Sequence, residues 1–91
     1  MRSKKVTIIN PTGLHARPAA EFNKTASQFR SEITVRKLGG DPQEGNGKSM
    51  INIMSMCLAQ GTDIEIVAEG EDEMNAVETL IALIKSGFGE I

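Results

Sequence analysis

The chain has 91 residues, which is enough for one small domain spanning residues 1–91 and too few for two. Its single cysteine, Cys57, excludes an internal disulfide and a cysteine-based zinc site, and no apolar run reaches membrane-spanning length. The apolar segment at residues 6–9 that follows the basic N-terminus is too short for a signal peptide, so we expect a soluble cytoplasmic protein without membrane insertion.

The net charge of −2 hides an uneven distribution of charge along the chain. Residues 1–48 carry nine Lys or Arg and four Asp or Glu, whereas residues 49–91 carry one and eight. A positive half suits the acceptance of phosphate groups or acidic partners. The alternative is that the two halves interleave in space and the asymmetry averages out.

The first half of the chain predicts two strands and one helix. Residues 5–9 and 31–37 alternate apolar and polar positions, which is typical of half-buried strands. Between them, residues 16–28 place apolar side chains three and four positions apart, which predicts a helix with one buried stripe. Residues 39–47 are rich in glycine and polar residues and predict a turn, with room for a short, weak strand.

The second half predicts two helices and one strand. Ser49 is a candidate N-cap for a short helix that ends near residues 60–61. Residues 62–68 alternate as a strand, and a last helix has the acidic triplet 71–73 in its first turn and ends near residues 85–87. We expect its buried stripe at Met74, Val77, Leu80, Ile81 and Ile84. Strands with one apolar face need one layer of helices, so the order predicts a two-layer α+β sandwich with an antiparallel or mixed sheet.

The only histidine, His15, follows the turn at Gly13 and lies at the predicted start of the first helix, with Pro18 in the first turn. A helix N-terminus offers free backbone N–H groups and the positive end of the dipole, and Arg17 adds a cationic fork suited to phosphate. A neutral imidazole there could attack phosphorus and hold the phosphoryl group against these donors. With no second histidine and no cysteine nearby, we expect no metal and no cofactor, and no motif supplies a nucleophile for a catalytic triad.

The short helix after Ser49 is apolar nearly all the way round. If Ile53, Met56, Cys57 and Leu58 point inward, three side chains remain outside, namely Met50, Ile51 and Met54. They form either a docking patch for partner proteins or additional core in a domain short of aromatic residues. A phosphate on Ser49 would place charge beside such a patch, although capping alone accounts for the serine. We expect Cys57 to be a small buried side chain and the triplet 71–73 to be solvated.

Three stretches together resemble the HPr family, the histidine-containing phosphocarrier proteins of the bacterial phosphoenolpyruvate-dependent sugar phosphotransferase system. They are Gly13-Leu14-His15-Ala16-Arg17-Pro18-Ala19-Ala20, Lys48-Ser49 with the methionine-rich helix, and Ala68-Glu69-Gly70-Glu71-Asp72-Glu73. The resemblance implies an open-faced sandwich of four antiparallel strands with three helices on one face. It implies that His15 takes phosphate on Nδ1 from phospho-enzyme I and passes it to sugar-specific IIA domains, with assistance from Arg17. A protein of this kind is a carrier in a relay and not an enzyme.

The resemblance also implies a regulatory site and a docking surface. Ser49 matches the serine that HPr kinase/phosphorylase modifies, which makes that enzyme and a catabolite-control regulator possible partners. Met50, Ile51 and Met54 match the patch that enzyme I and IIA domains use. The implied protein is a monomer.

Parts of the chain depart from the usual family pattern or point to other branches. Residues 39–47 look longer than the usual hairpin at this place and contain a proline. Residues 81–88 are similar to a paralogous branch of nitrogen-related regulators, whereas Lys48-Ser49 favours the sugar branch with serine control. A corepressor branch lacks the histidine, so His15 argues against it.

The rival outside the family is a small ligand-binding regulatory domain whose glycine-rich turn contacts a metabolite. A nucleic-acid binder lacks support because stacking aromatics and a basic stripe are missing.

Overall fold

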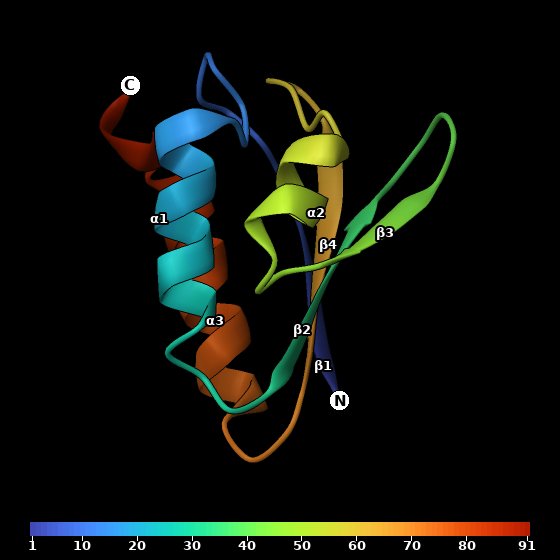
Figure 1. Cartoon of the computed structure of the whole chain (residues 1–91), viewed down its shortest axis with the longest axis vertical. Helices are drawn as coiled ribbons and strands as arrows, with labels where there is room; N and C mark the ends of the chain where they lie inside the picture. The colour runs from blue at the N-terminus through green and yellow to red at the C-terminus, as the bar shows by residue number, and fades with distance from the viewer.

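The computed structural model describes all of residues 1–91 and shows a four-stranded antiparallel sheet with three helices on one face (Figure 1). The strands are β1 (Arg2–Thr7), β2 (Glu32–Lys37), β3 (Gln43–Asn46) and β4 (Asp63–Glu69). The helices are α1 (Ala16–Ala26), α2 (Met50–Ser55) and α3 (Glu73–Lys85), and a 3-10 turn, η1 (Gly87–Gly89), follows them. The strand order is β1-β4-β2-β3, so β1 and β3 form the two edges. None of the helices is long and apolar enough to cross a bilayer.

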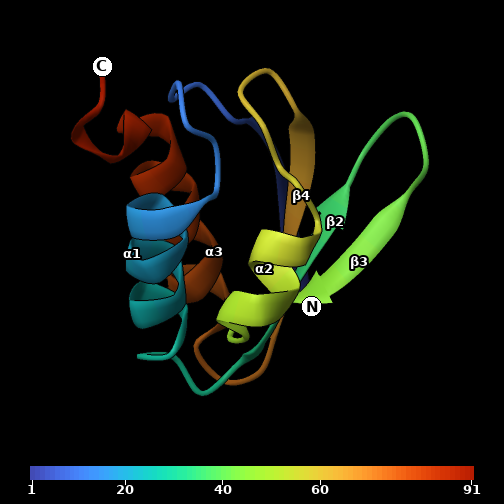
Figure 2. The same ribbon diagram turned by 45° about the horizontal axis from the view of Figure 1, so that its top comes forward.

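One hydrophobic cluster joins the sheet to the helices. Ile33 and Val35 of β2 are buried as the alternation predicts, and β4 contributes Ile64 and Ile66. Phe22 of α1 is the largest fully buried side chain and packs into the same cluster. Because strand side chains alternate between faces, the residues between these apolar positions lie on the opposite face, which no helix covers (Figure 2). The fold is therefore the two-layer arrangement that the sequence predicts, with one bare sheet face.

Two predicted element boundaries and one predicted core residue were wrong. The first strand begins at Arg2 and not at residue 5, because β4 is long enough to pair with β1 from Arg2–Ala68 to Thr7–Asp63. The first helix ends at Ala26 and not at residue 28. Met74 was expected in the buried stripe of the last helix, yet it is half exposed and Ala76 is buried one turn earlier than Leu80.

The acidic triplet at residues 71–73 was expected to be solvated; Glu71 is exposed, whereas Asp72 and Glu73 are partly exposed and also form specific contacts. Asp72 accepts hydrogen bonds from the backbone N–H groups of Arg30 at 2.9 Å and Ser31 at 3.0 Å, and from the Ser31 hydroxyl. These bonds, led by that of the hydroxyl, lower the pKa of Asp72 from 3.8 to about 2. Glu73 pairs with the amino group of Met1 at 2.8 Å. Asp72 thus fastens the connection between α1 and β2 to the start of α3.

Candidate functional site

His15 is the N-cap of α1, as the sequence predicts. Its backbone is extended, with φ of −133° and ψ of 154°, and its side chain makes no capping hydrogen bond. The imidazole is therefore exposed and free at a helix end whose first backbone N–H groups have no partner within the helix. Ala16, the first residue of the helix, has a φ of +47°, which is strained for a residue with a Cβ. Successive N–H groups around such a bend form a concave site that suits an anion.

The turn before His15 is pinned to the chain that follows α2. Gly13 has a φ of +68°, and a Cβ there would lie 2.3 Å from the carbonyl oxygen of Leu58, so only glycine fits. The next residue, Leu14, is buried and donates its N–H to the same carbonyl oxygen at 2.9 Å. These contacts fix where His15 leaves the turn and bring it next to the end of α2.

The C-terminal segment holds the other side of this turn. The carboxylate of Glu90 accepts hydrogen bonds from Asn10 Nδ2 at 3.0 Å, from Thr12 N at 3.2 Å and from Thr12 Oγ1 at 2.8 Å. The bonds from Asn10 and Thr12 lower the pKa of Glu90 below its ordinary value, with a smaller effect of the Arg17 charge. None of these three residues was identified from the sequence, because Asn10 and Glu90 are 80 positions apart and no motif links them.

Arg17 lies in the first turn of α1, and its guanidinium faces the C-terminal segment. Its Nη2 donates to the carbonyl oxygen of Phe88 at 2.8 Å and lies 3.7 Å from Glu90 Oε2, while its Nη1 pairs with Glu21. Phe88 itself is buried although its φ is +54°. The carboxylates of Glu21 and Glu90 offset the unfavourable interaction of the Arg17 charge with the positive end of the helix dipole. The guanidinium of Arg17, two residues after His15, is thus held by Glu21 and by the C-terminal segment.

The α2 helix divides into a buried and an exposed side. Ile53, Met56 and Leu58 are buried as expected, whereas Cys57, which was expected to be buried, is exposed. Its φ of +52° just past the end of α2 turns the side chain away from the core. Of the three residues expected outside, Met50 is 36% exposed and Ile51 81% exposed, while Met54 is partly buried against the core.

A hollow of about 260 Å³ connects this helix with the histidine. His15 and Thr12 line one side of it, and Met54 and Cys57 line the other. The α1 and α2 helices also lie side by side on the sheet in both views (Figures 1 and 2). His15 and the partly buried Met54 therefore border the same hollow.

Ser49 is the N-cap of α2, which confirms that prediction. Its Oγ accepts a hydrogen bond from the N–H of Asn52 at 3.3 Å, and it is only partly exposed. The neighbouring Lys48 extends its Nζ to the carbonyl oxygen of Phe29 at 2.5 Å, which ties the start of α2 to the segment after α1.

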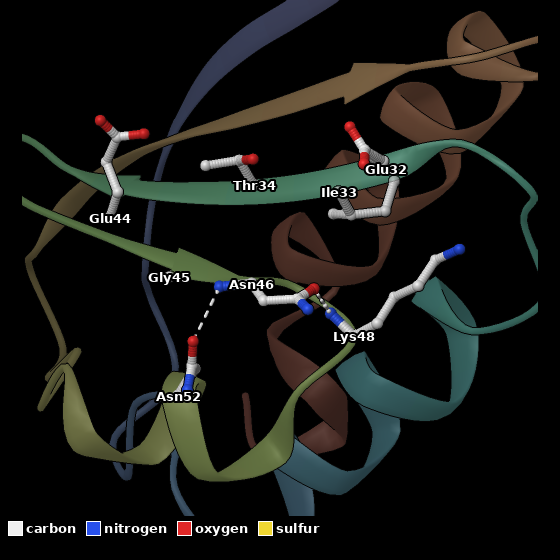
Figure 3. Close-up of a pocket in the computed structure, with 8 residues that line it drawn as sticks. All are labelled: Glu32, Ile33, Thr34, Glu44, Gly45, Asn46, Lys48 and Asn52. Atoms are coloured by element: carbon white, nitrogen blue, oxygen red, sulfur yellow. Dashed lines mark hydrogen bonds between the residues drawn. The ribbon is translucent and has the colours of Figure 1, made fainter.

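The largest hollow in the structure, about 410 Å³, is not lined by His15. Its lining residues come from the paired strands β2 and β3 and from the region around the start of α2 (Figure 3), and they include Glu32, Glu44 and Lys48. Asn46 and Asn52 close one side through a backbone-to-amide hydrogen bond of 3.2 Å. Two carboxylates against one amine make it a poor anion site despite its size. Nowhere does the chain gather three His, Cys, Asp or Glu side chains that could hold a metal ion.

Comparison with known proteins agrees with the resemblance. A family model described as "PTS HPr component phosphorylation site" matches residues 2–86. The phosphocarrier protein HPr of Haemophilus influenzae is 50% identical over 84 residues, which cover 92% of this chain and 95% of that protein. The structure of HPr-C-His from Thermoanaerobacter tengcongensis is 46% identical, covers 100% of this chain and 99% of that chain, and has a TM-score of 0.92. An HPr dimer from the same organism is 47% identical, covers 99% and 100%, and has a TM-score of 0.75. The chain belongs to the HPr family of phosphocarriers of the phosphotransferase system.

Proposed function

We propose that His15 accepts a phosphoryl group from phospho-enzyme I and passes it to sugar-specific IIA domains. The observation that carries this proposal is the free, exposed imidazole at the N-terminus of α1, with Arg17 in the first turn of the same helix. It is the only imidazole in the chain, so no other histidine competes for the role.

The site contains the groups that the proposed transfer needs. The lone pair of Nδ1 attacks phosphorus, a nitrogen–phosphorus bond forms, and the bond from phosphorus to the donor breaks with its electron pair leaving on the donor. The phosphoryl oxygens then meet the free N–H groups at the start of α1. Arg17 assists by moving from the Phe88 carbonyl and Glu90 towards these oxygens. The reverse displacement delivers the group to the acceptor.

A carrier must be bound by a donor and an acceptor in turn, and the exposed side of α2 supplies the surface for both. Met54 lines the hollow beside His15, and Met50 and Ile51 are exposed on the same helix. An apolar partner side chain that docks on these three residues would be buried close to the reacting groups. Ser49 begins this helix, so its phosphorylation by an HPr kinase/phosphorylase would put a dianion at the edge of the patch and weaken docking.

The test is phosphorylation with purified enzyme I and phosphoenolpyruvate, read by intact-protein mass spectrometry at neutral pH. One phosphoryl group should appear, and it should be lost after acid treatment. Ser49→Ala should be labelled like the wild type, whereas His15→Ala should remain unlabelled. A label that persists in His15→Ala would refute the assignment of His15.

The remaining parts of the proposal concern the state of the protein. Residues 1–91 act as one HPr domain in the cytoplasm, where the exposed thiol of Cys57 stays reduced. The working form is a monomer, although a relative 47% identical is described as a dimer. Light scattering coupled to size exclusion should give a monomer mass that does not change with concentration. A concentration-dependent dimer would overturn this part and leave the assignment of His15 unaffected.

A further inference from the structure

The outer edge of β1 has no strand beside it. The sheet order places β1 at one end and β3 at the other, so the outward backbone groups of Arg2–Thr7 have no partner within the chain. Five of its six residues are exposed, and it contains no proline, the residue that most directly blocks further pairing. The opposite edge, β3, is only four residues long. Of the two edges, β1 is therefore the one on which another extended segment could pair.

The bare face of the sheet carries a row of alternating charge that ends at this edge. The strand register places Glu44 opposite Arg36, Arg36 opposite Glu65, and Glu65 opposite Lys5. Ion pairs of 3.4 Å and 3.5 Å join Arg36 to Glu44 and Glu65. Lys5, the last member, forms no ion pair, and neither do Arg2 and Lys4 on the same strand. An acidic residue on a strand beyond β1 would continue this row of alternating charge.

The other face of β1 offers a place for an apolar side chain. A hollow of about 260 Å³ lies between β1 and α3, lined by Arg2, Ser3 and Lys4 on one side and by Met74, Val77 and Glu78 on the other. Met74 is 50% exposed, which leaves its thioether side chain available to a partner. Since strand side chains alternate, a segment that points an acidic residue at Lys5 points its next residue towards this hollow.

We propose that the β1 edge binds an extended, acidic segment of a partner protein as a fifth strand of the sheet. Asp or Glu at alternate positions would lie across from Lys5, and the intervening apolar side chains would enter the hollow beside Met74. A second copy of this chain is a poor occupant, because two β1 edges would bring their lysines together. This surface is separate from the His15 and α2 surface, so the inference does not depend on the proposed function.

The experiment uses the full chain labelled with nitrogen-15 and an acetylated, amidated hexapeptide that alternates valine and glutamate, titrated to millimolar concentration. The amide resonances of Arg2–Thr7 and of the start of α3 should shift, and amides on the outer edge of β1 should exchange more slowly with solvent. A peptide of the same composition with its valines and glutamates in two blocks should bind more weakly. A proline at the centre of the alternating peptide should abolish binding, because it removes a ladder donor.

Two charge reversals separate strand addition from general electrostatic attraction. Lys5→Glu should weaken binding about tenfold, since an attractive cross-strand pair becomes a repulsive one. Lys24→Glu changes the net charge equally on an exposed residue of α1 and should leave binding unchanged. Absence of shifts, equal binding of the block peptide, or equal weakening by the two variants would overturn the proposal. Self-association of the chain through this edge, seen as a mass that rises with concentration without peptide, would overturn it as well.

Discussion

Truncation of Ile51 to alanine should weaken docking of enzyme I while leaving the fold nearly unchanged. The side chain is 81% exposed, so the free protein gains little from it, and we expect the free energy of unfolding to change by less than about 0.5 kcal/mol. A partner that buries it would lose three aliphatic carbons in the variant. At about 0.8 kcal/mol per carbon, this is about 2 kcal/mol, or roughly thirtyfold in affinity.

The assay has two parts. Thermal unfolding of both proteins checks that the melting temperature is retained, and steady-state transfer from phospho-enzyme I gives KM and kcat for the phosphocarrier as substrate. The variant should raise KM roughly thirtyfold and leave kcat close to the wild-type value, because Ile51 contributes to binding and not to the reacting groups.

Met74→Ala is the matched control. Met74 is also an exposed apolar residue at the start of a helix, but it lies on α3 beside β1 and away from His15. It should leave both kinetic constants unchanged. Equal effects of the two truncations, or no effect of Ile51→Ala on KM, would refute the assignment of the exposed side of α2 as the docking patch.

Three further predictions follow from the site and its supports. Arg17→Ala should slow transfer about ten- to a hundredfold, because the transition state loses the free energy of one charge-assisted hydrogen bond. The circular dichroism spectrum should not change; a variant that only unfolds would show a structural role instead. Ser49→Asp should raise KM for enzyme I while Ser49→Asn, an equally good helix cap without charge, should not; a matching effect of both would point to capping. The depressed pKa of Asp72 gives stability that is complete above its ordinary value of 3.8 and is lost as the pH falls through about 2. Acid unfolding, followed by the fluorescence of a dye that binds exposed apolar surface, should show this loss of stability in the wild type and not in Asp72→Asn.

The periodic parts of the fold were predictable because their pattern is local. The helical spacing around Phe22 and the alternation around Ile33 and Val35 each lie within one element, and burial confirmed them. The first residues of β1 gave no such signal, since Arg2–Lys5 are all exposed and their strand structure comes from pairing with β4. Edge strands are the elements for which a neighbouring strand, and not the alternation of side chains, determines the length.

The site was predictable to the extent that a single stretch of sequence contains it. The position of His15 at a helix start and the capping role of Ser49 could be inferred from neighbouring residues, and the structure confirms both placements. The bonds from Asn10 and Thr12 to Glu90 could not, because they depend on how the C-terminal turn folds back. Cys57 was misplaced for a related reason. Its left-handed backbone depends on how the chain leaves α2, which the apolar pattern does not encode.

The central claim is that His15 carries the phosphoryl group, and a chase experiment tests it most directly. The protein is phosphorylated with enzyme I and phosphoenolpyruvate, freed from both, and then mixed with a IIA domain while the masses of both proteins are followed at neutral pH. One phosphoryl group should leave this chain and appear on the IIA domain, and His15→Ala should never acquire it. A group that stays on the chain, or one that is attached to another residue, would refute the role of His15.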